Sequence, residues 1–303
     1  MGLPVKPAIL VQGESITRMQ ATMDEQKFQS ACQLRDQGKL TEAYDEFIQL
    51  AESAADPLDK AGATIYAANT LEISGQIEAA TKKLREARSL IEGYPHPKSG
   101  ADEKLSALEL FLDYEGANLL WLRGGDLEAA LDKFEAAIKK HRLEARFSKH
   151  NLAPIELHAR DFYEAIQIRR AFILADLGRW KEALPILEGI ESPREYKEGI
   201  AFYLGHCYLA AQDYGKAEQK LTKALKLGGL PASLEYRAHC ELGMLYYNIG
   251  EYSKAKKELQ IGAEKADPIY IKESKIWKRL ELACRALGLK AEAEHYAHMQ
   301  NPS

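Results

Sequence analysis

Small and hydrophobic residues recur along the chain in a fixed register. The common pattern is a glycine, an apolar residue two positions later, an alanine five positions later and an apolar residue nine positions later, and Lys290 of the last copy departs from it at the second position. Steps of three and four residues place side chains on one face of an α-helix. The register occurs seven times, with its alanines at Ala43, Ala80, Ala130, Ala183, Ala217, Ala255 and Ala293. The pattern predicts an all-α protein built from repeats.

Glycines precede the expected second helix of each repeat. They are Gly38, Gly75, Gly125, Gly178, Gly250 and Gly288, and Gln212 takes the place of glycine in the fifth repeat. Glycine readily adopts the left-handed conformation that ends a helix, so the chain can reverse into an antiparallel partner. The alanine five positions later is small enough to let two helix axes come close. We therefore expect helix-turn-helix repeats in which Ala217 and Ala255 lie at helix crossings.

These residues resemble the tetratricopeptide repeat, and the stretches Ala201–Leu225 and His239–Asp267 match nearly the whole family pattern. The resemblance covers about residues 24–300 and implies a right-handed α-α superhelical solenoid. Its repeats are expected to start near Asp24, Ala61, Phe111, Glu164, Glu198, Tyr236 and Ser274. A helical bundle without repeats is the alternative, which seven copies in one register disfavour.

Two repeats are much longer than the family period of about 34 residues and contain insertions. One insertion, 92–103, contains two prolines and two glycines, which predict an exposed loop. The other, 138–163, has no helix breaker before Pro154, so we expect the second helix of the third repeat to run well beyond its usual length. Residues 1–23 lack helical periodicity and are expected to form a flexible tail.

Composition narrows the classes of function. A net charge of −4 gives no general reason to expect nucleic acid or an anionic membrane as a partner. The four cysteines, Cys32, Cys207, Cys240 and Cys284, are far apart and form neither a disulfide framework nor a zinc-binding pattern. No apolar run approaches the roughly 18 residues that a membrane span needs. We therefore expect a cytoplasmic protein.

The common catalytic motifs are absent. The sequence has no glycine-rich phosphate-binding loop, no Gly-x-Ser-x-Gly turn and no His-Glu-x-x-His helix. His295 and His298 lie three residues apart, as two metal ligands on one helical face would, but two further zinc ligands have no obvious source. We expect neither an enzyme nor a protein with a metal or another cofactor.

The family resemblance implies that the first helix of each repeat lines a concave groove. Carried onto this sequence, the exposed positions of those helices predict a peptide-binding groove with an aromatic middle and a basic end. The predicted groove residues are Ile168, Arg169, Phe172, Phe202, Tyr203, His206, Arg237, Met244, Tyr247, Asn248, Lys275, Lys278, Arg279 and Arg285. Apolar side chains of a peptide would enter the middle, and its acidic residues would meet the basic end. The alternative is that the aromatic residues only pack the helices together.

Two further sequence patterns, a possible dicarboxylate clamp and a basic stretch, bear on binding. The family's dicarboxylate clamp is not present in its usual form, because Asn69 occupies one clamp position while Ile65 and Gly116 occupy two others. The basic stretch 139–150 could contact RNA, DNA or an acidic protein, but a solvated helix face is the preferred interpretation for a net-acidic chain.

The leading hypothesis is an adaptor or scaffold that binds a peptide segment of a protein partner. The alternative is a regulatory or sensor subunit whose superhelix closes on a signalling peptide or small ligand. Self-association through the terminal repeats is a third possibility, which the polar final helix 289–300 disfavours, so we expect a monomer or weak homodimer.

Overall fold

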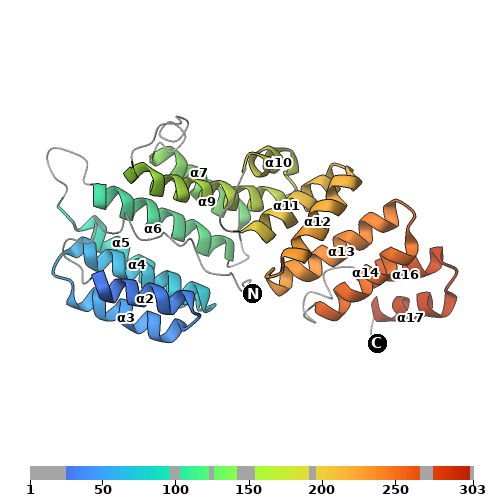
Figure 1. Cartoon of the computed structure of the whole chain (residues 1–303), viewed down its shortest axis with the longest axis horizontal. Helices are drawn as coiled ribbons and strands as arrows, with labels where there is room; N and C mark the ends of the chain where they lie inside the picture. Colours follow the sequence, from blue (N-terminus) through green and yellow to red (C-terminus); the bar gives the residue numbers. More distant parts are fainter. Residues whose placement is uncertain are drawn as a thin grey trace. The chain divides into compact units, whose positions relative to one another are not determined.

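The computed structural model describes residues 25–95, 103–122, 126–141, 154–190, 196–266 and 276–300 (Figure 1). Every regular element in these ranges is an α-helix, as the sequence predicts. None of the described helices is both long and apolar enough to cross a bilayer. The chain divides into two compact units, residues 1–173 and 174–303, and each is described by itself.

The described residues of the N-terminal unit form three helix pairs and most of a seventh helix. Its helices are α2 (Glu25–Asp36), α3 (Leu40–Ser53), α4 (Pro57–Ile73), α5 (Ile77–Glu92), α6 (Glu103–Leu122), α7 (Leu127–Lys140) and α9 (Pro154–Asp176), whose last three residues belong to the other unit. The two helices of each pair pack against each other, and the first helices α4 and α6 are also in contact.

The C-terminal unit continues the same arrangement. Its helices are α10 (Trp180–Glu188), α11 (Lys197–Ala210), α12 (Tyr214–Leu227), α13 (Ala232–Asn248), α14 (Tyr252–Lys265), α16 (Ile276–Ala286) and α17 (Lys290–Gln300). Contacts join α11 to α12, α13 to α14 and α16 to α17, and α11 also touches α13. First helices of successive repeats therefore lie next to one another.

The turns within the repeats have the conformation that the sequence predicts. Gly38, Gly75, Gly178, Gly250 and Gly288 all have positive φ angles, between 73° and 82°. Gln212 adopts the same left-handed region, with φ of 61°, although this conformation costs a residue with a side chain more than it costs glycine. The repeat geometry is thus preserved where the glycine is missing. Gly125 lies outside the described residues.

Small residues mark the places where paired helices meet. The seven register alanines are buried, and Ala217 and Ala255 are 0% exposed. Two glycines of first helices lie still closer to their partners. A Cβ atom on Gly205 would lie 2.6 Å from Leu221 Cγ, and one on Gly243 would lie 2.5 Å from Leu259 Cγ. These two crossings leave no room for a methyl group.

The predicted extension of the second helix of the third repeat is wrong. Helix α7 ends at Lys140, and His141 follows in a turn. Lys140 Nζ and His141 Nε2 lie 2.9 Å and 3.1 Å from Asp113 Oδ2 on α6, which ties the end of α7 to its partner. The extra length belongs instead to α9, whose 23 residues begin at Pro154, because proline suits the first turn of a helix. The tail 1–23 and most of the predicted loop 92–103 lie outside the described residues.

We predict that Gly205→Ala destabilises the protein by about 1–3 kcal/mol, the usual range for an overpacked interior. The matched control is Gly215→Ala on α12, where a Cβ atom would have no neighbour within 4 Å and alanine is the better helix former. Urea unfolding of both variants measures the difference. Equal midpoints would show that the crossing at Gly205 is not tight.

Candidate functional site

A cluster of charged and polar side chains joins the first helices of the C-terminal unit. It consists of Asp176 at the end of α9, Tyr203 and His206 on α11, and Arg237 and Glu241 on α13. The spacings of three and four residues place each pair on one face of its helix. We call these five residues the ionic cluster and the side of α11 and α13 that bears it the first-helix face.

Asp176 is held by two donors from different helices. The hydroxyl of Tyr203 donates to Asp176 Oδ2 at 2.9 Å, and Arg237 donates to Asp176 Oδ1 at 3.0 Å. The guanidinium group of Arg237 also lies over the rings of Phe202 and Tyr203, 5.1 Å and 6.0 Å from their centroids, where a cation is attracted to the ring face. Burial and the charge of Asp176 raise the pKa of Tyr203 well above its usual value, so its hydroxyl stays protonated.

The second half of the ionic cluster is a histidine and a glutamate. His206 Nδ1 lies 2.8 Å from Glu241 Oε1, and the His206 ring stacks on Phe202 with centroids 6.3 Å apart. Burial alone would lower the pKa of His206, but the Glu241 carboxylate outweighs it and raises the pKa above the ordinary 6.5. Each member of the cluster is thus oriented by a neighbour on another helix.

Accessible side chains continue from the cluster along α13. Met244 and Tyr247 are half-buried and Asn248 is exposed. The ring of Tyr247 packs against Tyr252 at 5.4 Å between centroids. On α16, Arg279 is also half-buried. The first-helix face therefore combines fixed charges with partly exposed apolar and amide groups.

Five predicted groove residues are not accessible, and that part of the prediction is wrong. Ile168, Arg169, Phe172, Phe202 and Tyr203 are at most 3% exposed. In the N-terminal unit, the ring of Phe172 packs on Trp121, over which the Arg169 guanidinium also lies, 4.8 Å from the ring centroid. In the C-terminal unit, Phe202 lies beneath Arg237. These side chains fill contacts between helices, as the packing alternative proposed.

Two cations of the predicted basic end pair with a single carboxylate of their own helix. Lys278 and Arg285 lie 2.9 Å and 2.7 Å from the two oxygens of Glu281, and Gln300 donates to the same carboxylate at 2.8 Å. Hydrogen bonds from Gln300 and Lys278 lower the pKa of Glu281, which therefore stays charged. Lys275 lies outside the described residues.

The basic stretch 139–150 is described only up to His141. Lys140 and His141 both contact Asp113 in the N-terminal unit. Burial would raise the pKa of Asp113, but hydrogen bonds from these two side chains outweigh it and lower the pKa to about 2. Within the described part of the stretch, Lys140 and His141 thus fasten α7 to α6.

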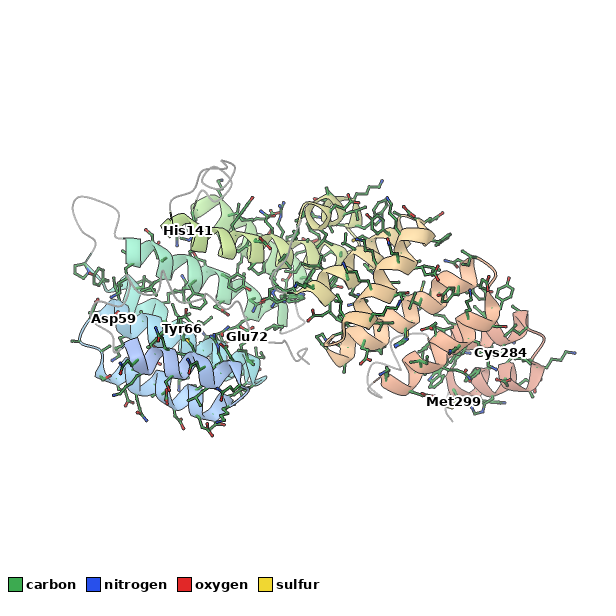
Figure 2. All side chains as sticks on the ribbon, viewed as in Figure 1. Asp59, Tyr66, Glu72, His141, Cys284 and Met299 are labelled. Carbon is green, nitrogen blue, oxygen red and sulfur yellow. The ribbon has the colours of Figure 1, made fainter. Side chains whose placement is uncertain are left out.

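The N-terminal unit also contains a series of buried hydrogen bonds between polar side chains that the sequence did not predict. Arg35 donates to Asn69, Asn69 donates to Glu115, and Asn118 donates to Glu72, which is labelled in Figure 2. The signal in the sequence was an Asn and a Glu three residues apart on two neighbouring first helices. Asn69 occupies one position of the family's dicarboxylate clamp, and its side-chain amide takes part in this buried contact.

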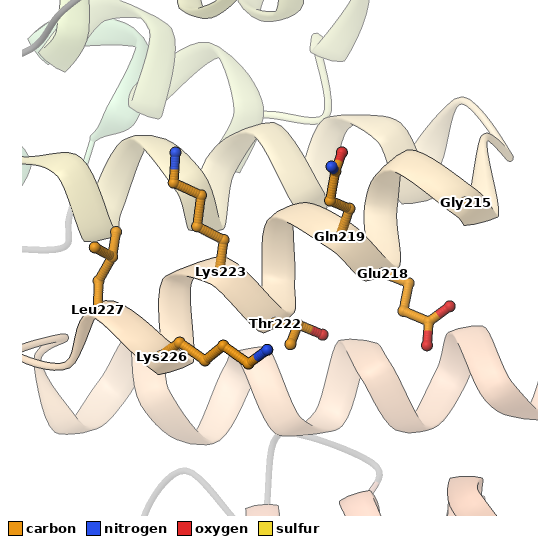
Figure 3. A pocket seen from close by; sticks show the side chains of 7 residues that line it. All are labelled: Gly215, Glu218, Gln219, Thr222, Lys223, Lys226 and Leu227. Carbon is orange, nitrogen blue, oxygen red and sulfur yellow. The ribbon is translucent and has the colours of Figure 1, made fainter.

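A hollow of about 550 Å³ lies elsewhere, along α12 (Figure 3). Its lining residues all come from that one helix and are Gly215, Glu218, Gln219, Thr222, Lys223, Lys226 and Leu227. Glu218 already accepts a hydrogen bond from Tyr246 at 2.7 Å. Because no second helix contributes side chains to it, the hollow lacks the convergent groups of a specific ligand site.

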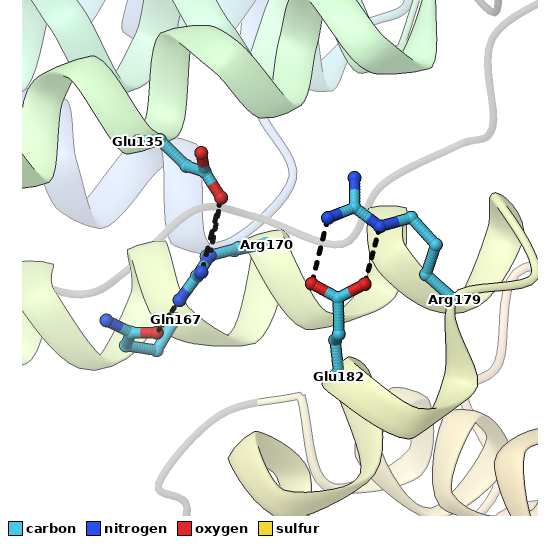
Figure 4. Close-up of polar contacts among 5 residues, drawn as sticks. All are labelled: Glu135, Gln167, Arg170, Arg179 and Glu182. Carbon is cyan, nitrogen blue, oxygen red and sulfur yellow. Dashed lines mark hydrogen bonds and ion pairs between the residues drawn. The ribbon is translucent and has the colours of Figure 1, made fainter.

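Exposed ion pairs occur near α9 and contribute little to either unit (Figure 4). In the N-terminal unit, Arg170 contacts Glu135 at 3.2 Å and also Gln167. In the C-terminal unit, Arg179 and Glu182 form a bidentate pair at 2.8 Å. Exposed pairs of this kind stabilise a protein by about 0–1 kcal/mol.

Metal-binding side chains do not gather in the part of the chain that the structure describes, where no three His, Cys, Asp or Glu residues form a possible site. The four cysteines are free thiols. Burial is the main cause of the raised pKa values of Cys32, at about 11, and of Cys207 and Cys240, at about 12. Their thiols are therefore protonated and unreactive near neutral pH.

Comparison with known proteins gives structural matches only. No protein-family model and no curated protein sequence matches the chain. The fold is similar to the apo form of the quorum sensor NprR from B. thuringiensis, at 15% identity, 91% coverage of this chain, 74% of that chain and a TM-score of 0.63. It is also similar to NprR in complex with its cognate peptide NprX, at 14% identity, 95% and 82% coverage and a TM-score of 0.50. A tetratricopeptide repeat protein from Parabacteroides merdae matches at 13% identity, 91% and 96% coverage and a TM-score of 0.47.

The helix pairs, their left-handed turns and the solved structures together define the class. The chain has a tetratricopeptide-repeat fold, an all-α array of helix-turn-helix repeats. At such low sequence identity the likeness extends to the fold and carries no function with it.

We predict that His206 titrates above pH 6.5 and that Glu241→Gln lowers its pKa. Because the pKa is raised in the folded protein, the contact stabilises the fold fully below about pH 6.5 and is lost as pH rises through the folded value. Proton NMR of the imidazole signal measures both pKa values. The control is Glu258→Gln, since Glu258 pairs with His239 and not with His206. An unchanged His206 pKa in Glu241→Gln would contradict the assignment.

Proposed function

We propose that the chain binds a peptide segment of a protein partner on the first-helix face of its C-terminal unit. The observation that carries this proposal is the ionic cluster, in which Asp176 and Glu241 hold Arg237, Tyr203 and His206 in fixed positions beside accessible groups. Side chains that are already oriented lose little conformational entropy when a ligand binds.

The neighbouring side chains suit a peptide better than a compact metabolite. Met244 and Tyr247 offer adaptable apolar surface, and Asn248 offers an amide that can both donate to and accept from a peptide backbone. They follow one another along α13, so an extended segment could contact them in turn. The likeness to NprR, which has been solved with its cognate peptide, supports the same proposal at the level of the fold.

The role of the binding surface is either that of an adaptor or that of a sensor. An adaptor keeps its conformation and only brings the partner into an assembly. A sensor changes conformation, because its ligand binds one state more tightly than another. Small-angle X-ray scattering with and without peptide separates the two, since a changed radius of gyration indicates a sensor. We further propose that the chain is not an enzyme and acts in the cytoplasm, where its free thiols would stay reduced.

The binding proposal predicts that a random peptide library contains ligands for the full chain and that two substitutions weaken them. Asn248→Ala and Tyr247→Ala should each cost about 1 kcal/mol or more, which is at least about a fivefold rise in Kd. Calorimetric titration of selected peptides measures these values. Lys223→Ala, on the hollow of α12, is the matched control and should leave Kd unchanged.

Two outcomes would contradict the proposal. One is a library selection that enriches no peptide at all. The other is a peptide whose affinity falls with Lys223→Ala but is indifferent to Tyr247→Ala and Asn248→Ala, which would place binding on α12. Circular dichroism of each variant confirms that lost affinity is not lost folding.

A further inference from the structure

Two glutamates lie inside the N-terminal unit and take no part in the first-helix face of the C-terminal unit. Glu72 lies on α4 and Glu115 on α6, and they are 4% and 1% exposed. Each has an asparagine three residues away on its own helix, Asn69 beside Glu72 and Asn118 beside Glu115. The two first helices thus present an Asn and a Glu to each other on facing sides.

The asparagines bond to the glutamates in a reciprocal way. Asn69 Nδ2 donates to Glu115 Oε1 at 3.1 Å, and Asn118 Nδ2 donates to Glu72 Oε1 at 2.6 Å. The second oxygen of each carboxyl group, Oε2, is buried and has no hydrogen-bond partner in the described part of the chain. Two carboxylates have no hydrogen to donate, so neither can satisfy the other while both are charged. A single proton on one of these oxygens would let one carboxyl group donate to the other.

The surrounding charges leave one glutamate without a counter-ion. From α2, the cation of Arg35 faces Glu115 and pairs with Asp36 at 3.4 Å, and from α9, the cation of Arg169 faces Glu72 and Glu115. Two positive charges thus stand against the three negative charges that Asp36, Glu72 and Glu115 would carry if all were ionised. Burial raises the pKa values of Cys32 on α2 and Tyr66 on α4, so neither adds a charge near neutral pH.

We propose that one proton, carried by Glu115 and shared with Glu72, locks α4 to α6, and that its loss at alkaline pH loosens the contact between the second and third repeats. With the proton in place, both carboxyl groups are satisfied. Without it, two negative charges face each other in the interior, where repulsion is strong and water cannot screen it.

The pKa values of Glu72 and Glu115 are both raised, which is the direction that a shared proton requires. Burial, followed by the negative charge of Glu72, raises the pKa of Glu115 well above its usual 4.5. A carboxyl whose pKa is raised on folding stabilises the protein below its unfolded pKa, and the stability falls as pH rises through the folded value. Asp113, whose pKa is lowered, contributes in the opposite direction and cannot produce this loss.

The direct test is a carbon-13 NMR titration of the glutamate side-chain carboxyls in the full chain between pH 4 and 9. We expect one carboxyl signal to titrate well above pH 4.5 and to be absent from the spectrum of Glu115→Gln. If every glutamate in the wild-type chain titrates near pH 4.5, the proposal is overturned. Because the wild-type protein alone gives this answer, it does not depend on a variant that folds.

A second measurement monitors the contact between α4 and α6 through hydrogen exchange of the backbone amides in these two helices. In the wild-type chain, protection should fall at least about tenfold between pH 7 and 9 beyond the intrinsic pH effect. Glu115→Gln should remove this fall, since its amide oxygen can accept from Asn69 and its NH₂ group can donate to Glu72 without any titrating proton. Glu78→Gln, at an exposed position of α5, is the matched control and should behave as the wild type. A fall in protection that persists in Glu115→Gln would contradict the proposal that a shared proton holds α4 to α6.

Discussion

Close approach of the two helices within each repeat is the constraint on which the other features depend. At Gly205 and Gly243 the partner leucines occupy the space of a Cβ atom, and the register alanines are buried at the same interfaces. Successive pairs stack with their first helices side by side, as α4 with α6 and α11 with α13 do. Small residues in the pairs therefore bring side chains of successive first helices within bonding distance.

Charged groups join those first helices in both units. In one unit Asp176, on α9, contacts Arg237, on α13, and in the other Asn69 and Glu72 of α4 contact Glu115 and Asn118 of α6. Buried polar contacts add little net stability compared with well-packed apolar residues, but breaking one side of a pair is costly. We infer that they fix how neighbouring repeats align. A surface that is aligned in this way is suited to recognition, because its groups are already in position.

Much of the fold could be predicted from the sequence, because local rules decide it. Glycine at a turn and alanine at a crossing are short-range requirements, and Gln212 shows that the turn persists when one residue departs from them. The accessible surface could not be predicted equally well. Phe202 is covered by Arg237, which lies on another helix 35 positions later in the sequence. A local sequence pattern does not reveal a contact between residues so far apart.

Contacts between residues far apart in the sequence also explain two other differences between the sequence prediction and the structure. The end of α7 at Lys140 has no glycine or proline to mark it, and contacts to Asp113 of another helix secure it. The role of Asn69 was hidden because its partners Arg35 and Glu115 come from two other repeats. For the candidate site, the sequence named His206, Arg237 and three residues of α13, which the structure places in or along the same helix as the ionic cluster. It gave no sign of the charge pairing that holds them.

The proposed binding surface is the first-helix face of the C-terminal unit. An NMR map of backbone amide shifts in the full chain, recorded on addition of a library-selected peptide, tests this proposal. We predict that the largest shifts fall on α11 and α13, around His206, Arg237 and Tyr247. Shifts confined to α12, around Lys223 and Lys226, would contradict it.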